Sequence, residues 1–148
     1  MATVLRISEA ASLGLHAMSL LAEAGEGWTS AGEMAETLGV SEAHLAKVLQ
    51  HLGRVGLVKS VRGPHGGFGL ARPGSGITLL EIYEAIEGPM AETHCLLGRQ
   101  VCHGSCLLGG LLKTVDELVR AQLSSTTLAP ALAGKVKGKR SKAKRSIA

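Results

Sequence analysis

The sequence predicts a mainly helical protein with a small β-wing, in which a winged helix-turn-helix is followed by a long C-terminal dimerisation helix. Two short helical segments joined by a Gly-Val-Ser turn come directly before a strand–turn–strand pattern. An amphipathic stripe of about four turns follows near the C-terminus. Only three of the 148 residues are aromatic, so the core must be built from aliphatic side chains. That composition favours helices over a β-sandwich.

Four side-chain hydroxyls are predicted to cap helices: those of Ser8, Ser30, Ser41 and Thr78. The four helices are expected to end near residues 24, 38, 54 and 88, where glycine or the end of the apolar period stops them. Glu33 and Glu81 stand three residues after a cap, which is the spacing of a capping box.

The helix from Glu42 to about Arg54 is the candidate recognition helix, because it follows the Gly-Val-Ser turn. Its inward face is expected to hold Leu45, Val48, Leu49 and Leu52. In a helix-turn-helix the N-terminal part of the second helix reaches base edges in the major groove. The expected base contacts are therefore Ser41, His44 and Lys47, and the expected phosphate contacts are Gln50, His51 and Lys59.

Strand patterns over residues 57–61 and 68–70 flank a glycine-rich turn, which together predict a wing directly after the recognition helix. Gly66 and Gly67 are expected to supply the positive φ that a tight hairpin needs. Arg62, His65 and Gly66 lie at the tip of this hairpin. There they can enter a minor groove or grip its backbone.

Basic residues are concentrated in two places. Residues 134–148 hold seven of the 16 Lys and Arg residues and no acid, and this tail lacks hydrophobic periodicity. The other nine are outnumbered by the 12 acidic residues, yet residues 43–80 carry five basic residues and no acid. A basic block inside an acidic body indicates a surface for an anion such as DNA phosphate.

Cys95, Cys102 and Cys106 are crowded into one short segment between the last two predicted helices. An odd number of closely spaced cysteines does not indicate a disulfide framework. Nearby glycines permit sharp turns, and Arg99 can favour the thiolate form, which is the form that ligates metals. Thiolates suit iron–sulfur clusters or zinc. The alternative is that the thiols are inert or redox-active.

The last predicted helix carries apolar residues at 108, 111, 112, 115, 118, 119 and 123. A second copy of the chain is its natural partner, and folding back on its own domain is the alternative. We expect four parts: a winged helix-turn-helix DNA-binding domain over 1–88, a cysteine-rich cluster-binding loop over 89–107, a dimerisation helix and C-terminal segment over 108–132, and a disordered basic tail over 133–148.

Several segments resemble the Rrf2 family of bacterial transcription regulators, which includes iron–sulfur assembly repressors and nitric-oxide sensors. The wing sequence LGRVGLVKSVRGPHGGFGLA (52–71), the recognition-helix sequence VSEAHLAKV (40–48) and the ends LRIS (5–8) and STTL (125–128) carry the resemblance. It covers residues 4–132. It implies a homodimer that crosses its long C-terminal helices, and an iron–sulfur cluster, [2Fe-2S] or [4Fe-4S], on the three cysteines. The cysteine spacing is tighter here than in the best-known members.

A cluster usually takes four ligands, and the loop offers three thiols. The resemblance points to the first helix of the partner subunit for the fourth. There the aligned position holds Ser12, a poor ligand, and His16 lies one turn later on the same helix face. His16 of the partner subunit is the first candidate, His103 the second and His94 the third, with Glu9 as an outside candidate.

The sequence therefore predicts a homodimeric, DNA-binding transcription regulator whose operator affinity is controlled by an iron–sulfur cluster. Loss of the cluster would release the loop and change the spacing of the two recognition helices, which must match half-sites about one DNA turn apart. A regulator of the same fold that senses through cysteine oxidation is the alternative.

Other functional classes find less support in the sequence. The patterns His-X-Glu, Gly-X-Ser-X-Gly and the phosphate loop are absent, so we expect no enzyme. A protein-interaction module that uses the amphipathic helix would lack the steep salt dependence of duplex binding. We expect a cytoplasmic protein, because neither a signal peptide nor a membrane span is evident.

Overall fold

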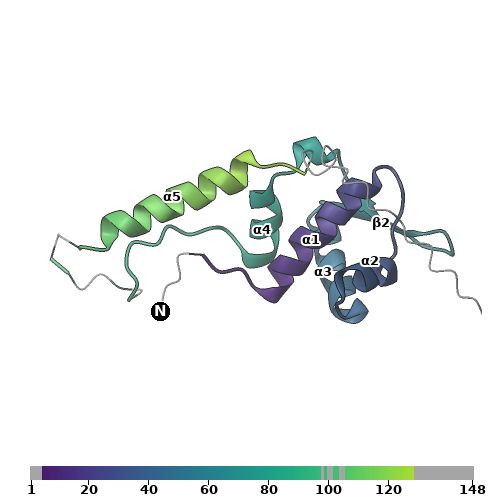
Figure 1. The fold of residues 1–148 in the computed structure, drawn as a ribbon, viewed down its shortest axis with the longest axis horizontal. Coiled ribbons are helices and arrows are strands. Elements are labelled where there is room, and N and C mark those ends of the chain that lie inside the picture. The colour runs from purple at the N-terminus through teal and green to yellow at the C-terminus, as the bar shows by residue number, and fades with distance from the viewer. Residues whose placement is uncertain (1–4, 98, 100–101, 104–105, 129–148) are drawn as a thin grey trace, which may run out of the picture.

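The computed structural model describes residues 5–97, 99, 102–103 and 106–128. Its elements confirm a mainly helical winged helix-turn-helix (Figure 1). In chain order they are α1 (Glu9–Ala24), α2 (Ala31–Leu38), α3 (Glu42–Arg54), β1 (Val58–Val61), β2 (Gly67–Leu70), the 3-10 turn η1 (Gly74–Gly76), α4 (Leu79–Glu87) and α5 (Gly109–Ser125). The tail from residue 133 lies outside the described residues.

All four predicted caps are confirmed, and they set where α1 to α4 begin. Ser8, Ser30, Ser41 and Thr78 each accept a hydrogen bond from a backbone N–H in the first turn of the following helix. Glu33 and Glu81 close the two capping boxes. Because the backbone N–H of Thr78 donates to the Glu81 carboxylate, the pKa of Glu81 lies below its ordinary value.

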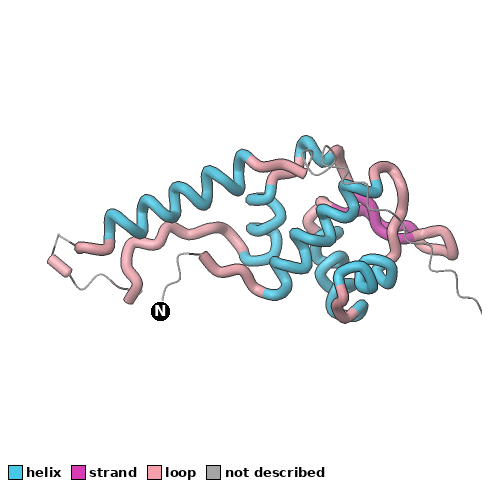
Figure 2. The backbone as a smooth tube through the Cα atoms, in the orientation of Figure 1, coloured by secondary structure: helices cyan, strands magenta, loops and turns pink. Residues whose placement is uncertain are grey.

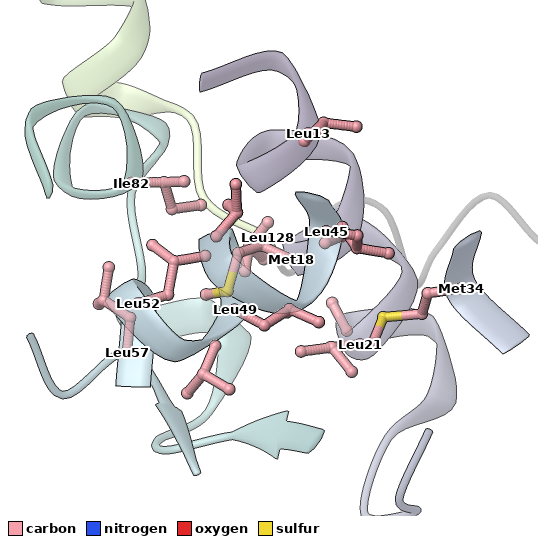
Figure 3. Packing of buried hydrophobic residues seen from close by; sticks show 14 of the residues in the cluster. Leu13, Met18, Leu21, Met34, Leu45, Leu49, Leu52, Leu57, Ile82 and Leu128 are labelled. Carbon is pink, nitrogen blue, oxygen red and sulfur yellow. The ribbon is translucent and has the colours of Figure 1, made fainter. Parts of the chain in front are cut away.

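The core lies where α1, α3 and α4 meet, and it is aliphatic as predicted (Figure 3). Met18 and Leu21 of α1 pack with the inward face of α3, and Ile82 of α4 closes the same cluster. The four expected inward residues of α3, namely Leu45, Val48, Leu49 and Leu52, are all buried. This packing holds α3 rigidly against the domain.

The wing is a two-stranded sheet (Figure 2). The strands are antiparallel, and their register pairs Val58 with Leu70 and Val61 with Gly67. The loop before α2 joins its edge, because Thr29 exchanges two backbone hydrogen bonds with Phe68 at 3.0 and 2.8 Å. The expectation about the turn glycines is half wrong. Gly67 has positive φ, but the other turn residue with positive φ is Gly63, and Gly66 has none.

Helix α5 begins far from the winged domain and runs back toward it, so that its C-terminal end lies beside α4 (Figure 1). Directly after α5 the chain is bonded to the domain, where the backbone N–H of Leu128 donates to the carbonyls of Gly74 and Ile77 at 3.2 and 3.1 Å. Much of the apolar stripe of α5 stays open, since Leu111 is 58% exposed and Leu118 66%. Among the described residues, no helix is long and apolar enough to cross a membrane.

Candidate functional site

The turn between α2 and α3 aims the recognition helix. Gly39 adopts a left-handed conformation (φ 66, ψ 37), and its N–H donates to the carbonyls of Ala35 and Glu36. This conformation strains residues with a side chain. The Ser41 hydroxyl then accepts the N–H of His44 at 3.3 Å, so α3 begins immediately after the turn. The N-terminus of α3 is thereby fixed relative to α2.

The outward face of α3 presents polar side chains to solvent. Lys47 and Gln50 are exposed, and so are Glu42 and Ala43 at the N-terminal end. The N-terminal part of the second helix of a helix-turn-helix is the part that reaches base edges, so this face remains the expected DNA contact. The opposite face of α3 is buried in the core, so only the outward face of this helix is available to a binding partner.

The two histidines of α3 are both engaged. Nδ1 of His44 lies 3.5 Å from a carboxylate oxygen of Glu9 in the first turn of α1. Nε2 of His51 donates to the carbonyl of Ala85 at 2.6 Å, which ties α3 to α4. His51 was expected at a phosphate, and the structure gives it this additional bond within the domain.

A groove of about 720 Å³ separates α3 from the wing. It is lined by Leu49, Gln50, Gly53, Arg54, Val58, Lys59, Ser60, Val61, Arg62, Gly67 and Phe68. Three of these residues are basic, and no acid stands among them. At the outer edge of the wing, Nζ of Lys59 lies 5.3 Å from the centre of the Trp28 ring. Arg62 and His65 are exposed near the hairpin tip. This face suits a polyanion that touches helix and wing together.

The three cysteines lie at the far end of α5 from the winged domain. All are free thiols; Cys95 and Cys102 are half-buried and Cys106 is exposed. Sγ of Cys95 donates to the carbonyl of Arg99 at 3.1 Å. Burial raises the pKa of the Cys102 thiol first, and the charge and hydrogen bond of Cys106 and the charge of Cys95 raise it further.

The described part of this segment is not arranged as a preformed metal site. Within the described residues, no three His, Cys, Asp or Glu side chains are arranged to hold a metal ion. The sulfur donors of the three cysteines nevertheless suit a cluster.

The candidates for a fourth ligand differ in the hydrogen bonds and ion pairs that they already form. Nδ1 of His16 lies 2.7 Å from the carbonyl of Ser12. A carbonyl only accepts, so Nδ1 is the donor of this bond and Nε2 is left for another partner. His94 pairs with Glu92 at 3.4 Å, and His103 is exposed. Glu9 faces His44 at the recognition helix.

Residues 7–134 match the family model Rrf2, described as an iron-dependent transcriptional regulator. The chain belongs to the Rrf2 family. Protein aau3 of Rhizobium meliloti (strain 1021) is 33% identical over 134 residues, which cover 80% of this chain and 87% of that protein. The family resemblance seen in the sequences of the wing and of the recognition helix is thus confirmed.

Two solved structures are similar to this Rrf2 protein. CymR (YrzC), the global cysteine regulator of B. subtilis, has a TM-score of 0.75 and 33% identity over 87% of this chain and 97% of that one. IscR of T. potens has a TM-score of 0.71 and 32% identity over 87% of each chain. Rrf2 proteins are transcription regulators that bind DNA and are typically dimeric.

Sequence reasoning missed three features of this Rrf2 protein. Thr29 extends the wing, His51 joins α3 to α4, and Asp116 of α5 is buried and accepts the backbone N–H of Thr93. A polar residue inside an apolar stripe was the signal that could have marked Asp116.

We expect Glu9→Gln to tighten duplex DNA binding by about twofold to fivefold at low salt, because it removes a negative charge beside His44 on the reading face. The gain should shrink as salt rises. Fluorescence anisotropy with a labelled duplex measures it. Glu117→Gln on α5, which removes the same charge far from α3, is the control. Equal affinity of wild type and Glu9→Gln at low salt would contradict the expectation.

Proposed function

We propose that this Rrf2 regulator is a homodimer that binds double-stranded DNA and whose operator affinity is controlled by an iron–sulfur cluster on Cys95, Cys102 and Cys106. The observation that carries the proposal is the placement of three free cysteines on the one short segment between α4 and α5. That segment links a DNA-reading domain to a helix with an uncovered apolar face. A [2Fe-2S] or [4Fe-4S] cluster would hold it in one conformation.

The proposed DNA contacts follow from the free face of α3 and from the wing. Helix α3 enters the major groove, and the wing grips the adjacent backbone or minor groove. Two of the proposed side chains already have partners within the domain: His44 faces Glu9, and His51 donates to the carbonyl of Ala85. Their DNA contacts must be compatible with these interactions. The full proposed set is Ser41, His44, Lys47, Gln50, His51, Lys59, Arg62, His65 and Gly66.

Dimerisation is proposed from the exposed leucines of α5. Leu108, Leu111 and Leu118 are 42%, 58% and 66% exposed, and an apolar stripe in water is stabilised by a symmetric partner. Leu5 and Ile7, just before α1, are exposed as well. A second copy that covers α5 brings its own first helix toward the cysteines.

Three thiolates leave a cluster short of one ligand, and His16 of the partner subunit is the proposed fourth. Metal-bound histidines usually donate their other ring N–H to a carbonyl or carboxylate. His16 already has that arrangement, because its Nδ1 donates to the Ser12 carbonyl and its Nε2 points to solvent. His103 is the second candidate.

His16→Ala is expected to shorten the lifetime of the reconstituted cluster about tenfold or more while the fold stays intact. Visible absorption in the presence of a chelator follows the loss, and circular dichroism checks the fold. His65→Ala, which removes an exposed histidine at the wing tip that is not a ligand candidate, is the matched control. A cluster that decays equally in His16→Ala and wild type would remove His16 from the ligand set.

Anaerobic purification followed by absorption, iron and sulfide analysis and native mass spectrometry tests the whole proposal. We expect a dimer that carries iron and sulfide in matching amounts. Operator affinity of the cluster-loaded and cluster-free protein is then compared at one fixed salt concentration, because phosphate contacts make affinity strongly salt-dependent. Equal affinities would refute control by the cluster.

Sensing by thiol oxidation is the second candidate, and the three free cysteines on one short segment favour it. Two adjacent thiols can pair directly when oxidised. The structurally similar CymR is a global cysteine regulator. Protein without iron or sulfide, whose DNA affinity changes on treatment with an oxidant and returns with a reductant, would decide for this candidate.

A further inference from the structure

The segment that leads from α4 into the cysteine loop is tied to α5 by side chains on successive turns. The backbone N–H of Thr93 donates to Oδ2 of Asp116 at 2.5 Å, and the Arg120 guanidinium donates to the carbonyl of Met90 at 2.5 Å. The N–H of Met90 donates to Glu84 of α4 at 2.9 Å. Residues 90–93 therefore lie between both helices, directly before Cys95.

Asp116 is the unusual member of this network. Its side chain is 6% exposed, it lies next to the apolar stripe of α5, and its Oδ1 has no hydrogen-bond partner in the described part of the chain. A buried carboxylate with one unpaired oxygen destabilises the state that buries it. Stability alone therefore gives no reason for an aspartate here.

Within the described residues, no basic side chain forms an ion pair with Asp116 itself, and the charges around it pair with one another. They border a cavity of about 350 Å³ beside it. Lys113 pairs with Glu117 at 3.8 Å, His94 with Glu92 at 3.4 Å and Arg120 with Glu84 at 3.9 Å. The contact that holds Asp116 is the Thr93 amide. Docking of the loop on α5 is therefore held by a strong hydrogen bond and opposed by a buried charge.

We propose that Asp116 is a positioning residue that couples the conformation of the cysteine loop to α5, and through α5 to the spacing of the two DNA-reading domains. The coupling rests on the proposed function. When the cysteines are held by their cluster, the N–H of Thr93 is held on Asp116 and the loop is fixed along α5. When the loop is released, both oxygens of Asp116 reach water, which favours the released state.

Hydrogen exchange on wild-type protein gives the first test. The backbone amide of Thr93 should exchange about tenfold faster in cluster-free than in cluster-loaded protein, because its acceptor is lost on release. Backbone amides in α3 should not change, since they belong to the core. Equal exchange at Thr93 in both states would overturn the proposal without any substitution being made.

Asp116→Ala gives the second test. Alanine is a strong helix former and leaves no acceptor for Thr93, so α5 should persist while the coupling is lost. We measure the ratio of DNA affinities of cluster-loaded and cluster-free protein, on a duplex that the wild type selects from a random pool. The wild-type ratio should be at least about fivefold, in the range usual for coupled sites. For Asp116→Ala it should fall to about one, with unchanged dimer mass and cluster absorption.

Two further variants complete the design. Asp116→Asn keeps one acceptor but loses the charge, and hydrogen bonds to charged acceptors are about twice as strong; its ratio should lie between the other two. Glu117→Gln removes a neighbouring exposed charge and should keep the wild-type ratio. A wild-type ratio retained by Asp116→Ala refutes the positioning role alone. A ratio of one in the wild type refutes the proposed function itself.

Discussion

Leu118→Glu is expected to convert the protein from a dimer to a monomer and to abolish specific DNA binding. Leu118 is 66% exposed on α5 although it belongs to the apolar stripe. Burying a leucine side chain contributes roughly 1.5–3 kcal/mol to the free energy of association. In a twofold symmetric interface each substituted position occurs twice, once in each subunit. Loss of both copies therefore lowers dimer affinity on the order of a hundredfold or more. Burying two glutamates adds to that loss.

Analytical ultracentrifugation over a concentration series measures the dimer affinity of Leu118→Glu. Ser124→Glu is the matched control, because it places the same charge on an exposed position of α5 outside the stripe. It should remain a dimer. Specific binding should be lost with the dimer, since one reading domain contacts one half-site only. A dimeric Leu118→Glu protein would show that α5 is not the interface.

The parts of the fold that sequence predicted well depend on short-range chemistry. A serine or threonine followed three residues later by glutamate satisfies backbone groups within a single turn, so Ser30 and Thr78 marked helix starts without knowledge of the tertiary structure. The burial of Leu49 and its neighbours likewise followed from helical spacing alone. Such signals lie wholly inside one element.

The features that sequence did not predict depend on contacts between distant segments. His51 donates to Ala85, 34 residues away, and Asp116 accepts from Thr93, 23 residues away. Neither residue type nor spacing identifies such a partner, because each side chain would be equally compatible with solvent. The cysteine site is a similar case. Three thiols suggested a metal site, but no three potential ligands are arranged around a metal position in the described part of the chain.

The wing turn shows how the same residue can be predicted for the wrong reason. Gly66 was expected to be glycine because of its φ, yet the positive φ values in this turn belong to Gly63 and Gly67. What requires glycine at 66 is space. A Cβ at this position would lie 2.0 Å from the carbonyl oxygen of Val61 and 2.9 Å from the carbonyl carbon of Arg62. Both are backbone atoms, which have no alternative rotamer to adopt.

Gly66→Ala is therefore expected to distort the wing and to weaken DNA binding about tenfold or more, while the helical core stays folded. The turn must open to separate the Cβ from Val61, and this breaks the bond from the Gly66 N–H to the Gly63 carbonyl. Arg62 and His65 then no longer meet DNA together with α3. Each lost charged contact costs on the order of 1.5–3 kcal/mol, so losing one is enough for the tenfold effect.

Two measurements separate a wing defect from general unfolding. Trp28 is the single tryptophan of the chain and packs against Gly69 of β2, so its fluorescence reports on the wing. Gly66→Ala should shift that signal and leave helical circular dichroism unchanged. Gly76→Ala is the control, because its Cβ would meet nothing closer than Nε of Arg72 at 4.0 Å. If Gly66→Ala bound DNA as tightly as Gly76→Ala, the wing would have no part in the affinity. The reading would then be done by α3 alone.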